Sequence, residues 1–197
     1  MTLSKRLFDL AVLVFLTILL APVMVVTAIA IAIIDGRPVF YFAERMKTPA
    51  HAFHLVKFRT MKTVLKDQGV SGGNKSDRVT RLGAFLRRAR LDETPQLWNL
   101  ARGDISLVGP RPPLREYVER FPETYSKVLK SRPGITGLAS SVFHAHETML
   151  IKNCETPEQT DKVYAERCVP RKAKLDLIYQ RNRSLCFDLW IVLKTFV

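Results

Sequence analysis

The feature that most limits how this chain can fold is an apolar run near its beginning, Leu10–Ile34, which contains no charged residue. As a helix rising about 1.5 Å per residue, these 25 residues are long enough to cross a hydrocarbon core of about 30 Å. Pro22 lies near the middle of the run, where it removes one amide donor and frees one backbone carbonyl. The run therefore predicts a membrane helix that is broken at Ala21–Pro22.

Basic residues flank both ends of this run, with Lys5 and Arg6 before it and Arg37 and Arg45 after it. A straight crossing would place one flank outside, against the tendency of positive charge to stay on the cytoplasmic side. A helix that breaks at Pro22 and returns both ends to the cytoplasmic face satisfies both flanks. We favour this re-entrant hairpin and keep the single crossing as the alternative. A cleavable secretory signal is disfavoured because the run is too long.

The chain as a whole is strongly basic, with a formal net charge of +13 over 197 residues. Such a charge indicates a polyanionic partner: nucleic acid, acidic lipid or a nucleotide-linked substrate. The three cysteines have neither metal nor redox spacing, which suits a reducing cytosol without disulfides. The four histidines give no metal pattern, and we interpret them as structural or surface residues.

Two short segments after the apolar run have strand character. Val39–Phe42 is apolar, and His51–Arg59 sets apolar residues among polar ones, which predicts a small antiparallel pair. In such a strand Lys57 and Arg59 lie on the same side, facing either phosphate or solvent. Glycine and polar residues dominate Val64–Ser76, which predicts a mobile surface loop. A phosphate cradle there is the weaker alternative, because the spacing of the phosphate-binding glycine motifs is absent.

An arginine-bearing helix is predicted next, because Leu82, Phe85, Leu86 and Ala89 fall at helical spacing. This helix should end near Leu91. Its arginines lie off the apolar face and are candidates for phosphate binding. The candidates are Arg87 and Arg88 of the helix, together with Arg78, which precedes it.

An acidic pair, Asp92 and Glu93, follows this helix directly. Thr94 and Pro95 are typical of the N-cap and first-turn proline of a further helix. The pair would then lie near the positive end of a helix dipole, which favours anions. Taken alone, an acidic pair before a helix is as often a solvated cap, so both roles stay open at this point.

A proline-rich loop shifts the balance towards a phosphate site. Pro110, Pro112 and Pro113 restrict the backbone on both sides of Arg111, so its guanidinium loses little entropy on binding. A planar, bidentate donor suits phosphate oxygens. We therefore take Asp92 and Glu93 as the catalytic candidates, with Arg111 as their phosphate-binding partner.

The remaining segments carry weaker signals. Leu114–Phe121 has helical spacing and should end before Pro122. The stretch Arg132–Gly137 predicts a tight glycine-rich turn whose arginine is a second phosphate candidate, and Asp176 falls in a further helical segment. The tail Phe187–Val197 is largely apolar and should lie at a membrane interface or pack as core.

These motifs together resemble the small monotopic phosphoglycosyl transferases, the bacterial sugar transferases that begin glycan assembly on a polyprenyl phosphate. The resemblance covers nearly the whole chain and rests on several motifs in order. They are Lys5–Asp9, Lys57–Met61, Arg78–Thr80, Leu91–Leu97, Gly103–Pro112, Arg132–Gly137 and the set Asp176, Tyr179, Asn182 and Asp188.

The resemblance implies a two-step phosphoryl exchange. Asp92 would attack the sugar-bearing phosphorus of a UDP-sugar and release UMP, while Glu93 would hold Mg²⁺ on the diphosphate. Polyprenyl phosphate, bound with help from Arg111, would then take the phosphosugar from the aspartate. The implied substrate-binding residues are Lys57, Arg59, Arg78, Arg87, Arg88, Arg111, Arg132 and Asp176.

The resemblance also implies a mostly helical α+β fold with a re-entrant membrane hairpin over residues 1–35. Residues 36–197 would form a catalytic domain on the cytoplasmic face of the inner membrane, with amphipathic interfacial helices and a short antiparallel β element. Its partners would be the UDP-sugar, polyprenyl phosphate, membrane lipid and a second copy in a homodimer. The break of the family is Ser-Pro, whereas this chain has Ala21–Pro22.

Two other classes of protein are weighed against this one. A basic nucleic-acid-binding protein would explain the charge, but no helix-turn-helix, zinc or RNP pattern accompanies it and the apolar run has no use there. A catalytically inactive membrane scaffold of the same fold would not need both Asp92 and Glu93. We therefore expect an enzyme that acts without nucleic acid.

Overall fold

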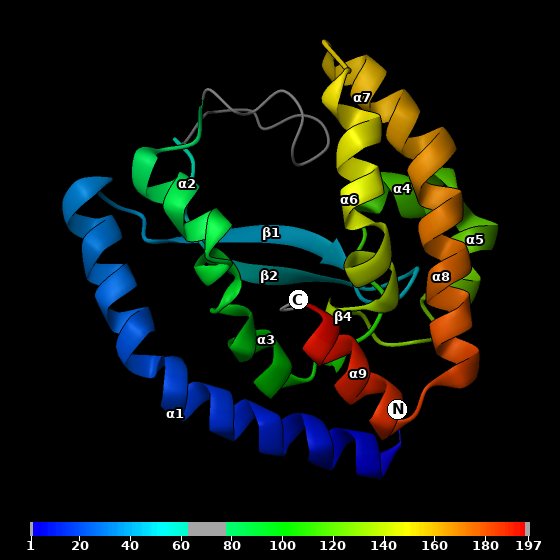
Figure 1. Ribbon diagram of the computed structural model, residues 1–197, viewed down its shortest axis with the longest axis horizontal. Helices are drawn as coiled ribbons and strands as arrows, with labels where there is room; N and C mark the ends of the chain where they lie inside the picture. Colours follow the sequence, from blue (N-terminus) through cyan, green and yellow to red (C-terminus); the bar gives the residue numbers. More distant parts are fainter. Residues whose placement is uncertain (1, 63–77, 196–197) are drawn as a thin grey trace.

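The structure, a computed structural model, describes residues 2–62 and 78–195 and is mostly helical (Figure 1). The predicted α+β class is confirmed at that level, while the predicted loop Val64–Ser76 lies outside the described residues. The elements are α1 (Leu3–Ile34), β1 (Phe40–Met46), β2 (Ala52–Phe58), α2 (Arg81–Arg88), the 3₁₀ turn η2 (Leu91–Glu93), α3 (Gln96–Arg102), β3 (Ser106–Val108), α4 (Arg115–Arg120), α5 (Pro122–Val128), β4 (Gly134–Thr136), α6 (Leu138–Lys152), α7 (Pro157–Val163), the π-helical turn η3 (Tyr164–Cys168), α8 (Val169–Asn182) and α9 (Leu185–Thr195).

Helix α1 is continuous and bends as it passes along two sides of the molecule (Figure 1). The predicted break at Ala21–Pro22 is wrong, because Pro22 lies inside the unbroken helix. A proline removes one hydrogen bond and bends a helix, and packing of both halves against one body allows the helix to continue. Only three of its 32 residues are buried. By length and composition alone, α1 is suited to crossing a membrane.

Both ends of α1 are fastened to the rest of the molecule. Near its start, the Arg6 guanidinium donates to the carbonyl oxygens of Leu100 and Ala101, each at 2.8 Å. At its end, Thr80 Oγ1 donates to the Asp35 carboxylate at 2.8 Å. Apolar residues from the middle of the helix pack on a cluster from β1, β2 and α3. The helix therefore lies along one body instead of projecting away from it.

The first sheet is the predicted antiparallel pair. Strands β1 and β2 are in register from Phe40 opposite Phe58 to Met46 opposite Ala52. The face of β2 that carries Phe53 and Leu55 packs in the core cluster beneath α1 and α3. The sheet thereby holds Lys57, near the end of β2, at the level of η2.

The second sheet was not predicted. Strands β3 and β4 pair in parallel, with Ser106 opposite Gly134 and Val108 opposite Thr136. The tight turn predicted at Arg132–Gly137 is therefore wrong. Two glycines explain why, since a Cβ on Gly134 would collide with the backbone of Gly109. They permit a close approach of two distant segments, and the long-range backbone hydrogen bonds override the local turn signal.

The last part of the chain is helical, with α6 and α8 side by side (Figure 1). Helix α4 ends before Pro122 as predicted, and this proline then begins α5. Helix α9 packs partly as core, which is one of the two roles left open for the tail. Asp188 and Ile191 are buried, while Leu189 and Trp190 are 51% and 46% exposed.

Candidate active site

The acidic pair is presented by a sharp change of direction after α2. Arg90 has φ of 55°, in the left-handed region that a residue with a Cβ adopts at a cost of about 1–2 kcal/mol. The chain then forms η2, which carries Asp92 and Glu93. The predicted N-cap role of Thr94 is wrong, because its hydroxyl donates back to the Leu91 carbonyl at 2.8 Å and closes this turn.

Glu93 is the paired member of the two. Its Oε1 lies 2.7 Å from Lys57 Nζ and 3.2 Å from Arg111 Nη2. The side chains of Glu93 and Lys57 are 17% and 16% exposed, whereas that of Arg111 is 45% exposed, so solvent weakens the second pair. Burial opposes ionisation, but Arg111 and Lys57 outweigh it and hold the pKa of Glu93 at about 2. Glu93 is therefore a carboxylate across the physiological range.

Asp92 has the opposite environment. Within the part of the chain that the structure describes, its carboxylate forms no ion pair within 4 Å, and it is half-buried. Burial and the negative charge of Glu93 raise the pKa of Asp92, against the opposing effect of Lys57 and Arg87. A raised pKa makes this carboxylate the more basic and more nucleophilic of the two.

The loop after β3 brings Arg111 to the acidic pair, as the sequence predicted. Glu93 raises the pKa of Arg111 against the partial desolvation of its guanidinium, and Tyr164 and Glu147 contribute in the same direction. Lys172 Nζ completes this group by contacting Glu147 Oε1 at 3.0 Å. No sequence pattern predicts these residues of α6, η3 and α8, because they approach Arg111 only in the folded chain.

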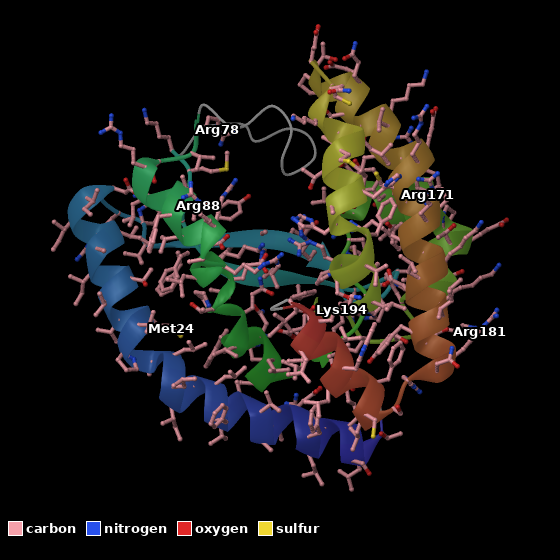
Figure 2. All side chains as sticks on the ribbon, in the orientation of Figure 1. Met24, Arg78, Arg88, Arg171, Arg181 and Lys194 are labelled. Carbon is pink, nitrogen blue, oxygen red and sulfur yellow. The ribbon has the colours of Figure 1, made fainter. Side chains whose placement is uncertain are left out.

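The other predicted cationic residues divide into two groups. Arg87 remains beside the pair, where its charge acts on Asp92 while its Nε donates to Thr60 Oγ1 at 2.9 Å. Arg88 is exposed on α2 (Figure 2). Arg59 binds elsewhere, donating to the carbonyl oxygens of Asp35 and Gly36, each at 2.6 Å.

Two further candidates are also placed away from the acidic pair. Arg78 donates to the Lys62 carbonyl at 3.4 Å. Arg132 lies beside Gly103 and Arg6, where it lines a separate cavity with Lys5. The structure therefore brings together Lys57, Arg87 and Arg111 at the pair, and separates Arg59 and Arg132 from it. Fewer basic residues therefore lie at the acidic pair than the sequence predicted.

Asp176 lies on α8 in a buried position, where its Oδ1 has no hydrogen-bond partner in the described part of the chain. Burial raises the pKa of Asp176 to about 7, while Lys172, one turn earlier on the same helix, acts in the opposite direction. No contact with the acidic pair is present among the described residues. The structure therefore shows a carboxyl that is costly to ionise.

Asp176→Asn should stabilise the protein at pH 8. An aspartate with a raised folded pKa contributes its full stability below its unfolded value near 4 and loses it as pH rises through about 7. The variant should match wild type at pH 4 and exceed it at pH 8, on the order of a few kcal/mol. Urea unfolding at both pH values measures the difference.

Asp161→Asn is a control for which we expect the opposite dependence of stability on pH. The hydrogen bond from Tyr117 lowers the pKa of Asp161, so this variant should lose stability at pH 8 and approach wild type at low pH. If Asp176→Asn were instead less stable than wild type at pH 8, the carboxylate would be an ionised, stabilising group and the assignment would be wrong.

A metal site at the pair would depend on few protein ligands. No group of three or more His, Cys, Asp or Glu side chains suited to a metal occurs in residues 2–62 and 78–195. Mg²⁺ commonly uses one or two carboxylates and completes its shell with phosphate oxygens and water. An ionised Glu93 next to Asp92 fits that donor set.

A buried network at the start of α1 was missed at the sequence level. Lys5 Nζ lies 2.6 Å from Asp9 and 2.9 Å from Asp188, whose side chains are 0% and 2% exposed. Ser106 donates to the second oxygen of Asp9, and Tyr179 donates to the second oxygen of Asp188. This network joins α1, β3, α8 and α9.

Fold and site together define a protein with a membrane-type helix joined to a cation-lined carboxylate centre. The chain belongs to the bacterial sugar transferase family, whose profile matches all of residues 1–197. This match confirms the resemblance drawn from the sequence motifs.

Three relatives illustrate the membership. The chain is 35% identical over 198 residues to a UDP-glucose:undecaprenyl-phosphate glucose-1-phosphate transferase of Caulobacter vibrioides, covering 98% of this chain and 68% of that protein. It is 34% identical to the transferase of the same name in Escherichia coli, covering 98% and 39%. An N-acetylgalactosaminephosphotransferase that uses undecaprenyl phosphate in Aeromonas hydrophila is 33% identical, covering 97% and 42%. The chain thus spans about two fifths of the last two proteins.

Proposed function

We propose that this protein transfers a sugar-1-phosphate from a UDP-sugar to polyprenyl phosphate and releases UMP. The observation that carries the proposal is the unequal acidic pair, in which Glu93 is held ionised by two cations and Asp92 is unpaired among the described residues. The relatives are named for their action on UDP-sugars and undecaprenyl phosphate, which supports the same substrates here.

In the first step, an Asp92 carboxylate oxygen attacks the phosphorus that bears the sugar. The bond from this phosphorus to the bridging oxygen breaks, and that oxygen leaves with UMP. In the second step, an oxygen of polyprenyl phosphate attacks the same phosphorus and the bond to Asp92 breaks. Each step exchanges one phosphorus–oxygen bond for another, so the carboxylate is regenerated.

The cations around the pair make this exchange possible. An anionic nucleophile approaches an anionic diphosphate only where positive charge compensates the repulsion. Lys57 and Arg111 lie within 4 Å of Glu93, and the charge of Arg87 acts on Asp92. Mg²⁺ bound at Glu93 would supply further compensation of the diphosphate charge. Asp92 remains the group that forms the bond.

The attachment of α1 at both ends supports a one-sided membrane placement. Arg6 near its start and Asp35 at its end both bond to the same folded body. A helix crossing straight through a bilayer would carry its ends to opposite faces. We infer that α1 lies in one leaflet with both ends on the cytoplasmic side. Cysteines introduced at Thr2 and Lys47 should then react with a thiol reagent added from the same side only.

The experiment that tests the proposed reaction is a search for the covalent intermediate. Incubation with a UDP-sugar and Mg²⁺ but without polyprenyl phosphate should add the mass of one phosphosugar to the protein, at Asp92. Chelation of Mg²⁺ should prevent the addition. Glu93→Gln should raise the Mg²⁺ concentration needed for half-maximal adduct at least about tenfold.

Glu44→Gln provides a matched control for that variant. Glu44 also pairs with an arginine, Arg115 at 2.8 Å, but both side chains are 48% exposed on β1 and α4. Its Mg²⁺ requirement should equal that of wild type. Product formation without any adduct on Asp92 would refute the two-step route, and an inactive scaffold would give neither product nor adduct.

A further inference from the structure

A cavity lined by charged and hydroxyl side chains lies away from the acidic pair. It measures about 190 Å³ and lies between the start of α1, β3, the end of α8 and the start of α9. In Figure 1 this is the region around the N label, where α8 leads into α9. None of its lining residues belongs to η2 or to the Arg111 loop. The cavity is therefore separate from the proposed reaction centre.

The charged side chains of this cavity leave a positive surplus. Lys5, Arg132 and Arg183 line it together with Asp188. Lys5 is already matched by Asp188 and by Asp9 behind it. Within the described residues, neither arginine has a hydrogen bond or an ion pair through its guanidinium. The formal balance of these five groups is one positive charge, which one monovalent anion would neutralise.

Two serine hydroxyls in the lining are arranged to donate. Ser131 Oγ accepts a hydrogen bond from Gln180 Nε2 at 3.0 Å. Ser184 Oγ accepts one from the backbone N–H of Phe187 at 3.2 Å. Each hydroxyl thus keeps its own proton for another acceptor. Two guanidinium groups and two donating hydroxyls are a donor set suited to phosphate oxygens.

The helices that flank the cavity also carry exposed apolar side chains. Leu3 and Leu7 at the start of α1 are 76% and 59% exposed, and Leu189 and Trp190 of α9 are 51% and 46% exposed. Such residues suit contact with lipid acyl chains, and Trp190 suits the headgroup boundary. The anion that reaches this cavity should therefore belong to a lipid.

We propose that this cavity binds the phosphodiester headgroup of an anionic membrane phospholipid. The inference rests on the one-sided membrane placement proposed above. One headgroup phosphate carries the single negative charge that balances the lining. Because one water occupies about 10–15 Å³ of such a volume, 190 Å³ accommodates a phosphate with its attached glycerol. Bound there, the lipid would connect α1 to α9 beside the membrane surface.

The test measures lipid binding directly and does not depend on turnover. The full chain in neutral detergent micelles is titrated with phosphatidylglycerol, and native mass spectrometry counts the bound lipids. Wild type should retain one phosphatidylglycerol in preference to phosphatidylcholine. The double variant R132Q/R183Q should bind it at least about tenfold more weakly.

Arg181→Gln is the matched control. Arg181 lies two residues before Arg183 near the same end of α8, is exposed and does not line the cavity (Figure 2). It should bind phosphatidylglycerol within twofold of wild type. If the double variant does not fold, the single variant R183Q replaces it in the lipid-binding measurement, because Arg183 is exposed. The proposal would be overturned if R181Q and R183Q weakened phosphatidylglycerol binding equally, or if wild type retained phosphatidylglycerol and phosphatidylcholine equally. Either result would indicate general attraction of lipid to the basic surface.

Two further measurements are made. The first distinguishes a lipid phosphate from free phosphate, and the second distinguishes the lipid-binding proposal from the proposed reaction. Inorganic phosphate at millimolar concentration should not displace the lipid, and displacement would identify the cavity as a free-phosphate site instead. The Asp92 adduct is measured on the same samples. Lost lipid selectivity with an intact adduct refutes this inference alone, whereas a missing adduct with intact lipid binding refutes the proposed reaction alone.

Discussion

Asp92→Asn should lower the rate of UMP release at least about 10³-fold. The amide has the shape of the carboxylate but lacks the charge and the nucleophilic oxygen, so the bond to phosphorus does not form. Folding should be preserved, because Asp92 forms no ion pair in the described residues. Release of UMP from a UDP-sugar, followed with and without polyprenyl phosphate, measures the effect.

Asp161→Asn is a suitable comparison for this loss. Asp161 is also a partly exposed aspartate, but it pairs with Arg120 at 2.8 Å and lies on α7. It should retain turnover close to wild type. Equal thermal unfolding temperatures for the Asp92 variant and wild type would exclude misfolding as the cause. Wild-type turnover in the Asp92 variant would transfer the nucleophile to another group.

Lys5→Met should destabilise the protein by about 3–5 kcal/mol. Its ammonium group neutralises Asp9 and Asp188 at once, and both carboxylates are almost fully removed from solvent. Methionine preserves the length of the side chain but leaves two buried negative charges without compensation. Thermal unfolding should shift down by about 10 °C for a chain of this size.

The origin of this loss can be tested with a rescue. In the triple variant K5M/D9N/D188N the charges are removed together, so most of the lost stability should return. Lys174→Met, at an exposed position on α8, should leave the unfolding temperature unchanged. If K5M is as stable as K174M, the network would contribute nothing measurable and α1 would be held by its apolar contacts.

Local patterns predicted those parts of the fold that depend on near neighbours. The alternation in His51–Arg59 gave β2, and the helical spacing from Leu82 gave α2. The placement of the acidic pair between two helices and the approach of Arg111 were also predicted. A few consecutive residues carry the signal for the strand, the helix and the pair, whereas the approach of Arg111, 18 positions from Glu93, was inferred from the phosphate chemistry that the two segments share.

The predictions that were wrong or absent concern contacts between residues far apart in the chain. Strands β3 and β4 have three residues each, too few for periodicity, and they form because distant glycines permit a close approach. Arg59 and Arg132 have the charge expected of phosphate ligands, but Arg59 donates to carbonyl oxygens outside its own segment, and Arg132 lies beside Gly103 instead of the acidic pair. Lys5 pairs with Asp9 one helical turn away, as i,i+4 spacing allows, but its pairing with Asp188, 183 positions away, follows from no spacing rule.

The fastening of α1 at both ends has a consequence for the choice of lipid carrier. If α1 lies in one leaflet as proposed, its two attachments to the folded body would hold the carboxylate oxygen of Asp92 at a constant height above the acyl chains. The proposed enzyme would then recognise the position of the carrier's phosphate at the membrane surface and not the length of the carrier's isoprenoid tail. Short and long isoprenoid carriers should accordingly serve as acceptors with similar efficiency, provided that each is anchored in the bilayer.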